Sequence, residues 1–566
     1  MKNRDFALVT ERMGPLPLVN HFLDHLGIEE TFERFVPTTH PRVKLSYAKA
    51  LGILLRSILT EREPIYRLGE VVESYDPAQF GLEEHEAGEV KDDSVGRALE
   101  RLFDADRGSM LTELVVTAAQ EFGLDLGELH NDSTSVRFTG QYSNAKGRSI
   151  RGRRAPFITY GFSKDHRPDL KQLLFILTTT KDGAVPVQFR CEAGNESDSR
   201  THEETWEALC RVTGRHDFLY VADGKLCNAE AMDHIDGRHG RFVTVIPRNR
   251  LEDKEFREWI QTHEPKWEKV RDQRNPRRKG GPRDRWYAMK YHIPSREAWP
   301  VIWVFGSLLR LKQEQARRER IARAEQRLED LARSYEEGRP RKKARHEVQR
   351  QIDEILESCK VRSYVRVSLD RIYLHTYKQD RPGRPGPDTK YIRKTKRKWR
   401  ITWRVDEDRV AYDHKSDGMF PLLTNDRNLT VSEVFEAYKR QPKIEKRFQQ
   451  AKTVHEIAPV LLKNEDRIEA LFFLYFIALL VQTLIERELR NAMKREGIEA
   501  LPLYPEERAN KRPTADQILK LFSLVQRNVL VAKGCEVEVF EAELTDLQKQ
   551  ILKMLGVPEA AYLRRR

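Results

Sequence analysis

The sequence predicts an α/β fold: a mixed sheet with helices, interrupted by a β-rich insertion with a helical hairpin and preceded by a helical N-terminal domain. Apolar residues at three- and four-residue spacing over residues 1–125 predict the helical domain. A strand, a hairpin, a helix and a buried strand follow over 126–250, and that order is the skeleton of an α/β domain. Basic breaks rich in proline and glycine then flank a long charged helical region, which predicts the insertion over 251–400.

The N-terminal helices are clearest in LPLVNHFLDHLGI and YAKALGILLRSIL. We expect residues 1–125 to contact DNA or a second subunit, although a structural cap fits the same pattern.

The α/β block supplies two aspartates at the ends of its predicted strands. LGELHNDSTSVRF (126–138) predicts a strand that ends at Asp132, and FLYVADGKLCN (218–228) predicts a buried strand that ends at Asp223. Between them, KQLLFILTTTKDGAVPVQFRCEAG predicts a hairpin that turns at Asp182-Gly183. Because open α/β sheets place their sites at the carboxyl ends of strands, both aspartates are candidates. A turn former or helix cap is the ordinary role of such a residue.

The insertion is expected to carry a helical hairpin with an exposed seam that could join two subunits. The seam residues are Ile321, Ala324, Leu328, Leu331 and Tyr335, then Val348, Ile352, Ile355 and Cys359. Residues 401–490 should return to the α/β domain, beginning with a strand-like segment at 400–425, and 491–566 should form a helical C-terminal region. The apolar run ALFFLYFIALLVQTLI is short for a membrane span, so we expect a buried core helix.

Composition points to nucleic acid as the partner. Lys and Arg number 101 against 88 Asp and Glu, a formal net charge of +13, and such a balance favours a polyanion. The sequence shows no signal-peptide pattern and no paired cysteines, which suggests a reducing cytoplasm and no membrane. It contains neither H-E-x-x-H nor a G-x-x-x-x-G-K-[ST] loop, so neither a zinc hydrolase nor nucleotide use is indicated.

A third carboxylate lies in the basic segment YKRQPKIEKRFQQAK, where Tyr438, Glu445 and Lys452 are each seven residues apart. Such a segment is ordinarily an exposed amphipathic helix. If Glu445 converged with Asp132 and Asp223, the three could hold a two-metal clamp for phosphoryl transfer.

LHNDSTSV, YVADGKLCN and YKRQPKIEKRFQQAK together resemble the DDE transposases of bacterial insertion sequences, which have a ribonuclease H-like fold. Tyr438, Glu445 and Lys452 match that group's Y-R-E-K signature in register, whereas Gln441 stands at its arginine position and Arg440 is adjacent. Residues 193–204, 416–426 and 459–481 resemble the same branch, so the likeness spans roughly 90–490.

The resemblance implies that Asp132, Asp223 and Glu445 are the catalytic residues and the ligands of Mg²⁺, with Mn²⁺ able to substitute. It implies cleavage at transposon ends, followed by joining of the 3′-hydroxyl to target DNA by two-metal-ion phosphoryl transfer. The implied partners are double-stranded DNA, as inverted terminal repeats and target, and a second copy of the chain in a synaptic complex. The implied location is the bacterial cytoplasm, at the nucleoid.

DNA contacts are expected at Tyr438, Arg440 and Lys452. A second set lies in the basic run 390–400, which alternates with aromatic residues: Arg393, Lys394, Lys396, Arg397 and Lys398. A charge run of this kind is usually just solvated. Trp286, with Tyr287 and Trp303, could stack on a displaced base, although a tryptophan in a strand is more often core. Asn195, Glu196 and Asp198 form a capped turn or orient the metal ligands, and the turn is slightly favoured.

Two other functions fit the same residues. One is a DNA-binding or architectural protein without catalysis, although it would have no need for the three carboxylates. The other is a structure-selective nuclease of the same fold, which would cut DNA without joining it.

Overall fold

The computed structural model describes residues 6–138, 142, 147–161, 167, 169–196, 201–274, 281–336, 344–454, 462, 464–504, 506, 508–532 and 535–563. The chain forms two compact units. Unit 1 comprises residues 1–244, 424–426 and 436–566, and unit 2 comprises 245–423 and 427–435.

Unit 1 begins with a strand and a group of helices. The helices are α1 (Leu16–His25), α2 (Ile28–Phe35), α3 (Tyr47–Leu59), α4 (Leu68–Glu73), α5 (Asp92–Asp104) and α6 (Arg107–Phe122). Ser46 caps α3 by accepting a hydrogen bond from the Lys49 amide at 3.2 Å. Helix α3 is buried on nearly all sides, because twelve of its thirteen residues are buried. The predicted N-terminal helices are confirmed.

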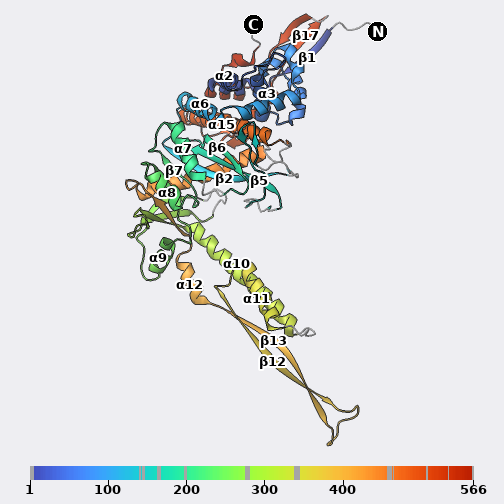
Figure 1. Ribbon diagram of the computed structural model, residues 1–566, viewed down its shortest axis with the longest axis vertical. Coiled ribbons are helices and arrows are strands. Elements are labelled where there is room, and N and C mark those ends of the chain that lie inside the picture. Colours follow the sequence, from blue (N-terminus) through green and yellow to red (C-terminus); the bar gives the residue numbers. More distant parts are fainter. Residues whose placement is uncertain are drawn as a thin grey trace. The chain divides into compact units, whose positions relative to one another are not determined.

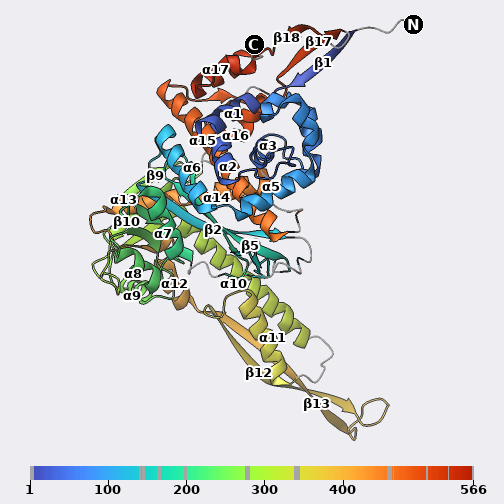
Figure 2. The same cartoon turned by 45° about the horizontal axis from the view of Figure 1, so that its top comes forward.

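The termini of unit 1 form a sheet that the sequence did not predict. Strand β1 (Phe6–Arg12) pairs antiparallel with β17 (Gln526–Ala532), which pairs with β18 (Cys535–Phe540); Figure 2 shows β1 beside these strands. The expectation that 1–125 and 491–566 are helical therefore holds only in part, because both segments also contribute strands. The pairing partner of β1 lies more than 500 residues away, and local periodicity carries no information about it. The remaining elements here are β15 (Leu501–Pro502), β16 (Ala509–Asn510), α16 (Ala515–Leu521) and α17 (Asp546–Leu555).

Five strands of unit 1 form a mixed sheet in the order β6-β5-β2-β7-β8. They are β2 (Glu128–Phe138), β5 (Lys171–Thr180), β6 (Pro186–Ala193), β7 (Leu219–Val221) and β8 (Arg241–Val245). Strands β2, β5 and β6 are antiparallel, whereas β7 and β8 run parallel to β2. The predicted hairpin is confirmed, with Gly183 at φ +84° in its turn. Helices α7 (Thr201–Thr213) and α8 (Ala229–Asp236) connect the later strands.

Helix α15 (Glu465–Arg495) is the core helix of unit 1. By length and hydropathy it could cross a membrane, but 89% of its most apolar stretch is buried inside the protein. Phe472, Phe473 and Phe476 contact Phe175 and Phe189 of the sheet. The expectation of a core helix is confirmed.

Unit 2 contains a four-stranded antiparallel sheet in the order β14-β11-β10-β9. Its strands are β9 (Glu268–Gln273), β10 (Asp284–Lys290), β11 (Val301–Gly306) and β14 (Met419–Thr424). Helices α9 (Leu251–Trp259) and α12 (Glu407–Lys415) belong to the same unit, so the segment 400–425 is only partly strand.

A helical hairpin and a long β-ribbon complete unit 2 (Figure 1). Helices α10 (Ser307–Glu336) and α11 (Arg345–Ser358) confirm the predicted hairpin, and β12 (Val365–Gln379) pairs along its whole length with β13 (Tyr391–Val405). The seam is not an exposed dimer surface, contrary to expectation. Ala324, Leu328 and Ile352 are fully buried, in a core that includes Leu369 and Ile401 of the ribbon. The ribbon covers the seam within the chain.

Candidate functional site

Two of the three predicted carboxylates lie at matching levels of neighbouring parallel strands. Strand β2 pairs with β7 up to His130, which lies opposite Val221. Asp132 is two residues beyond His130, and Asp223 is two residues beyond Val221. Because parallel strands rise equally per residue, both aspartates reach the same edge of the parallel part of the sheet.

The sequence predicted a strand that ends at Asp132, but the strand continues beyond this residue. Strand β2 continues to Phe138 because its other neighbour, the antiparallel β5, pairs with it over residues 129–138. Only the pairing with β7 stops before Asp132. Asp132 therefore lies just beyond the pairing of β2 with β7 and within the pairing of β2 with β5.

Backbone amides and a hydroxyl fix these two aspartates. The Ser133 amide donates to Oδ1 of Asp132 at 2.7 Å, and the Lys225 amide donates to Oδ1 of Asp223 at 3.1 Å. The Thr244 hydroxyl donates to the backbone carbonyl of Asp223 at 2.6 Å. Both aspartate side chains are half-buried.

Glu445 is exposed on α14 (Pro442–Gln449), and Tyr438 lies near the end of α13 (Val431–Arg440). Burial raises the pKa of the Tyr438 phenol, and the charges of Asp223 and Glu445 raise it further. Both carboxylates therefore act on one phenol, which puts Glu445 in the neighbourhood of Asp223.

The joint between α13 and α14 is docked on β2 by two side chains. Gln441 is buried; its amide donates to the Asn131 carbonyl at 2.6 Å, and its Oε1 lies 3.2 Å from Nδ1 of His130. Arg440 donates to both carboxylate oxygens of Glu128 at 2.6 and 2.8 Å. The helix that carries Glu445 is thus attached beside Asp132 on the strand.

The charge of Glu128 is strongly stabilised at this joint. Burial alone would raise the pKa of Glu128, but hydrogen bonds from His130, at 2.9 Å, and from Arg440 outweigh it and lower the pKa to about 2. Gln441, which occupies the arginine position of the signature, attaches the joint between α13 and α14 to β2. Arg440, expected to contact DNA, makes its ion pair with Glu128, so its DNA contact stays a prediction.

Sequence reasoning missed Glu128 and His130, although a signal was present. Glu128, His130 and Asp132 alternate along β2 and so share one face of the strand. Polar residues at alternate positions of an otherwise buried strand indicate that this face meets other polar groups.

Lys452 lies in a π-helical turn (Gln450–Val454) that continues α14. Seven residues bring Lys452 and Glu445 to one face of a regular α-helix, and the wider turn alters that alignment. Such turns are frequent at functional sites.

The three carboxylates supply oxygen ligands of the kind that Mg²⁺ prefers. Within the described part of the chain, however, no three Asp, Glu, His or Cys side chains lie close enough to hold one metal ion. The three residues fit the ion by their chemistry, and strand register brings the two aspartates together, but the three side chains do not form one ligand set. Of the predicted turn residues Asn195, Glu196 and Asp198, Asn195 is in a turn after β6, and Asp198 lies outside the described residues.

Trp286 does not present its ring for stacking on a base. It is 7% exposed and packs against Phe420 and Phe435 inside unit 2. Trp303 is fully buried and stacks on Phe256 at 3.6 Å. The expectation for Trp286 is corrected, because a ring buried in this core is closed to DNA.

The basic run forms part of the exposed β12–β13 ribbon. Residues 365–405 hold thirteen Lys or Arg and three Asp, a net charge of +10 within a chain of +13. Most of the protein's excess positive charge is therefore carried by this ribbon.

The ribbon has two different faces, because opposed residues of an antiparallel pair share a face. On one face Arg397 lies opposite Tyr373 and Arg393 opposite Tyr377, and both tyrosines are more than half exposed. Trp399 continues this face with the Arg371 guanidinium 4.8 Å from its ring centroid.

The other face carries the lysines. Lys394 lies opposite Thr376, Lys396 opposite Leu374 and Lys398 opposite Ile372. The Lys398 ammonium donates to the Glu336 backbone carbonyl, so that lysine is tied to the end of α10, while Lys394 and Lys396 are exposed.

Comparisons with known proteins add little to this geometry. Residues 8–116 match a family described as a domain of unknown function, DUF4277. No curated protein matches the chain. Among solved structures, the chain matches a piggyBac transposase synaptic complex with hairpin DNA at 9% identity, over 87% of each chain, with a TM-score of 0.25. A superposition at that score does not establish a shared fold.

Proposed function

We propose that the chain is a DNA transposase of the DDE type, with a ribonuclease H-like catalytic domain, that acts on DNA in the bacterial cytoplasm. The observation that supports the proposal is the docking of one helix on the strand that carries a candidate aspartate. Asp132 and Asp223 lie at matching levels through strand register, and α14, which carries Glu445, is attached to β2 through Gln441.

Asp132, Asp223 and Glu445 would hold Mg²⁺ or Mn²⁺. Bound divalent cations supply charge stabilisation to the attacking and leaving oxygens of an in-line displacement. The Tyr438 phenol is protonated at neutral pH, as any tyrosine is, and would donate a hydrogen bond to a phosphate oxygen. Lys452 would hold the neighbouring phosphate by charge.

The reaction has two steps at this edge. Water attacks a phosphodiester at the transposon end and displaces a 3′-hydroxyl. That hydroxyl then attacks a second phosphodiester and displaces its 3′-oxygen, so no covalent link to the protein forms. The β12–β13 ribbon would bind the duplex by phosphate contacts, which fix position without reading sequence.

The test is strand cleavage and strand transfer on a labelled duplex that carries the repeat flanking the gene, with Mg²⁺ or Mn²⁺. Glu445→Gln should lose both reactions and keep DNA binding, while Glu496→Gln, an exposed glutamate at the end of α15, should keep all three. Cleavage without joining would favour a structure-selective nuclease. DNA binding without chemistry in any variant would favour an architectural protein, and an active Glu445→Gln would refute the assigned site.

A further inference from the structure

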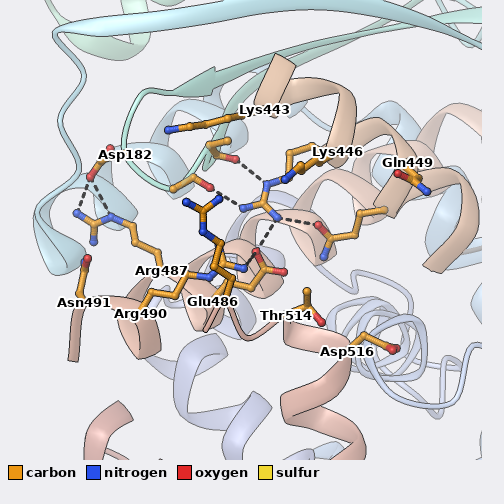
Figure 3. Close-up of a pocket in the computed structure, with 15 residues that line it drawn as sticks. Asp182, Lys443, Lys446, Gln449, Glu486, Arg487, Arg490, Asn491, Thr514 and Asp516 are labelled. Atoms are coloured by element: carbon orange, nitrogen blue, oxygen red, sulfur yellow. Dashed lines mark hydrogen bonds and ion pairs between the residues drawn. The ribbon is translucent and has the colours of Figure 1, made fainter. Parts of the chain in front are cut away.

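A cavity of about 610 Å³ lies in unit 1 beside α14 (Figure 3). Its wall is built from the β5–β6 turn at 182–184, α14, α15 and the segment 512–516. Nothing in the proposed reaction uses this space.

Cations dominate the lining of this cavity. Three carboxylates line it: Asp182, Glu486 and Asp516. Six cationic side chains line it: Lys443, Lys446, Arg447, Arg487, Arg490 and Arg512.

Three of the arginines are engaged by two of the carboxylates. Glu486 pairs with Arg447 at 2.8 Å and with Arg490 at 3.2 Å. Arg487 donates twice to Asp182, at 2.9 and 2.7 Å (Figure 3).

The third carboxylate, Asp516, is engaged from outside the lining. It pairs with Arg62 at 2.6 Å and Lys520 at 3.0 Å. The acidic groups of the wall are therefore already neutralised.

Lys443, Lys446 and Arg512 have no carboxylate within 4 Å among the described residues. The Lys443 ammonium donates to the Lys181 carbonyl at 3.3 Å. Burial lowers the pKa of Lys443 and the charges of Arg440 and Arg512 lower it further, while the charges of Glu128 and Asp182 partly offset them. An anion would relieve this repulsion.

The wall behind these cations is tied together by Arg447. Arg447 is 6% exposed, and its guanidinium donates to the Ala184 carbonyl at 3.1 Å, the Gly183 carbonyl at 2.5 Å and the Gln450 side chain at 2.8 Å. The hairpin turn and α14, which both line the cavity, are thereby joined.

The lining favours a phosphate over a whole nucleotide, because none of its residues is aromatic and a base would have nothing to stack on. Lys443 and Arg447 lie four residues apart and share a face of α14. Glu445 lies about 200° around the helix from Lys443 and about 100° from Lys446, and it is not among the residues that line the cavity.

We propose that this cavity binds a phosphate of the DNA backbone beside α14, and so anchors the helix that carries Glu445. The proposal deepens the proposed function and rests on it for the identity of the DNA.

The test measures duplex affinity of the full chain by fluorescence anisotropy from 50 to 300 mM salt. Lys443→Gln/Lys446→Gln/Arg512→Gln is compared with a control of equal charge change at exposed helix ends, Lys494→Gln/Arg495→Gln/Lys553→Gln. Removing one phosphate interaction lowers the slope of log K against log salt by about 0.9. The slope should therefore fall by about 0.9 in the cavity variant and stay close to the wild-type slope in the control.

Equal slopes in the two variants would overturn the proposal. Thermal unfolding with inorganic phosphate tests whether the ligand is free phosphate instead. If phosphate stabilises the wild type but not the cavity variant, and the DNA slopes of the two are the same, the cavity binds free phosphate. The variant Lys443→Arg/Lys446→Arg keeps both charges and should have the wild-type slope. That result would exclude a folding defect as the cause of a lower slope in the glutamine variant. A chain that binds DNA through this cavity but never cuts it would refute the proposed function alone.

Discussion

Replacing Glu128 by glutamine should loosen α14 and, with it, the position of Glu445. In the native protein the pKa of Glu128 is lowered from 4.5 to about 2, and each pKa unit corresponds to about 1.36 kcal/mol. The ion pair with Arg440 and the bond from His130 thus stabilise the joint by about 3 kcal/mol at neutral pH. Glu128 is 7% exposed, so solvent screening removes little of this.

The effect should depend on pH with a defined sign. Because the native pKa is depressed, the stabilisation is complete above about pH 4.5 and is lost as pH falls toward 2. The linkage relation leaves roughly 1.4 kcal/mol at pH 3.

Hydrogen exchange with mass spectrometry on peptides spanning 436–449 measures local opening directly. In Glu128→Gln these amides should exchange roughly 100-fold faster at pH 7, and the difference should shrink at pH 3 after correction for intrinsic rates. Glu496→Gln is the control. Unchanged protection of α14 in Glu128→Gln, or a difference that grows toward low pH, would refute the claim that this ion pair holds the helix.

Three further results are expected. Arg393→Gln/Arg397→Gln should weaken duplex binding roughly 30-fold at 0.15 M salt if both side chains contact phosphates, as measured by anisotropy; a weakening no larger than that of a distant double Lys→Gln variant would contradict the role of this face. Ile352→Ala should destabilise the helical hairpin by about 2–5 kcal/mol, because it leaves a cavity in the core, and should raise proteolysis within 307–405. Light scattering should find the same molar mass as for the wild type. A change of oligomeric state would mean that the seam does join subunits. Chelation by EDTA should abolish cleavage but not binding, with recovery on adding Mg²⁺ or Mn²⁺; cleavage that persists in the chelator would remove the metal from the proposal.

Local patterns in the sequence predicted local structure well. The turn at Asp182-Gly183, the hairpin seam around Leu328 and the core helix at 470–485 all depend on periodicity or turn chemistry, which neighbouring residues determine. Each of these features was confirmed.

Features that depend on distant partners were missed. Nothing near Phe6 indicates that it pairs with Ala532. Nothing near Leu328 shows that β12 and β13 will cover the seam. The position of Asp132 within β2 depends on two neighbours with different pairing lengths.

Residue types predicted part of the geometry around the candidate site. Asp223 does follow a buried strand, and the charges of Asp223 and Glu445 both raise the pKa of Tyr438. The burial of Trp286 agrees with the core role that is common for a tryptophan in a strand. The pairing of Arg440 with Glu128 could not be predicted, because it depends on residues brought together only by the fold.

The pairing of β1 with β17 has a consequence for biosynthesis. Strand β1 leaves the ribosome before its partner, which follows about 500 residues later. At 5–20 residues per second, the unpaired edge of β1 waits roughly half a minute to two minutes for β17. Strand β1 is therefore open to intermolecular pairing during that interval, and its sheet becomes possible only when β17 has been made.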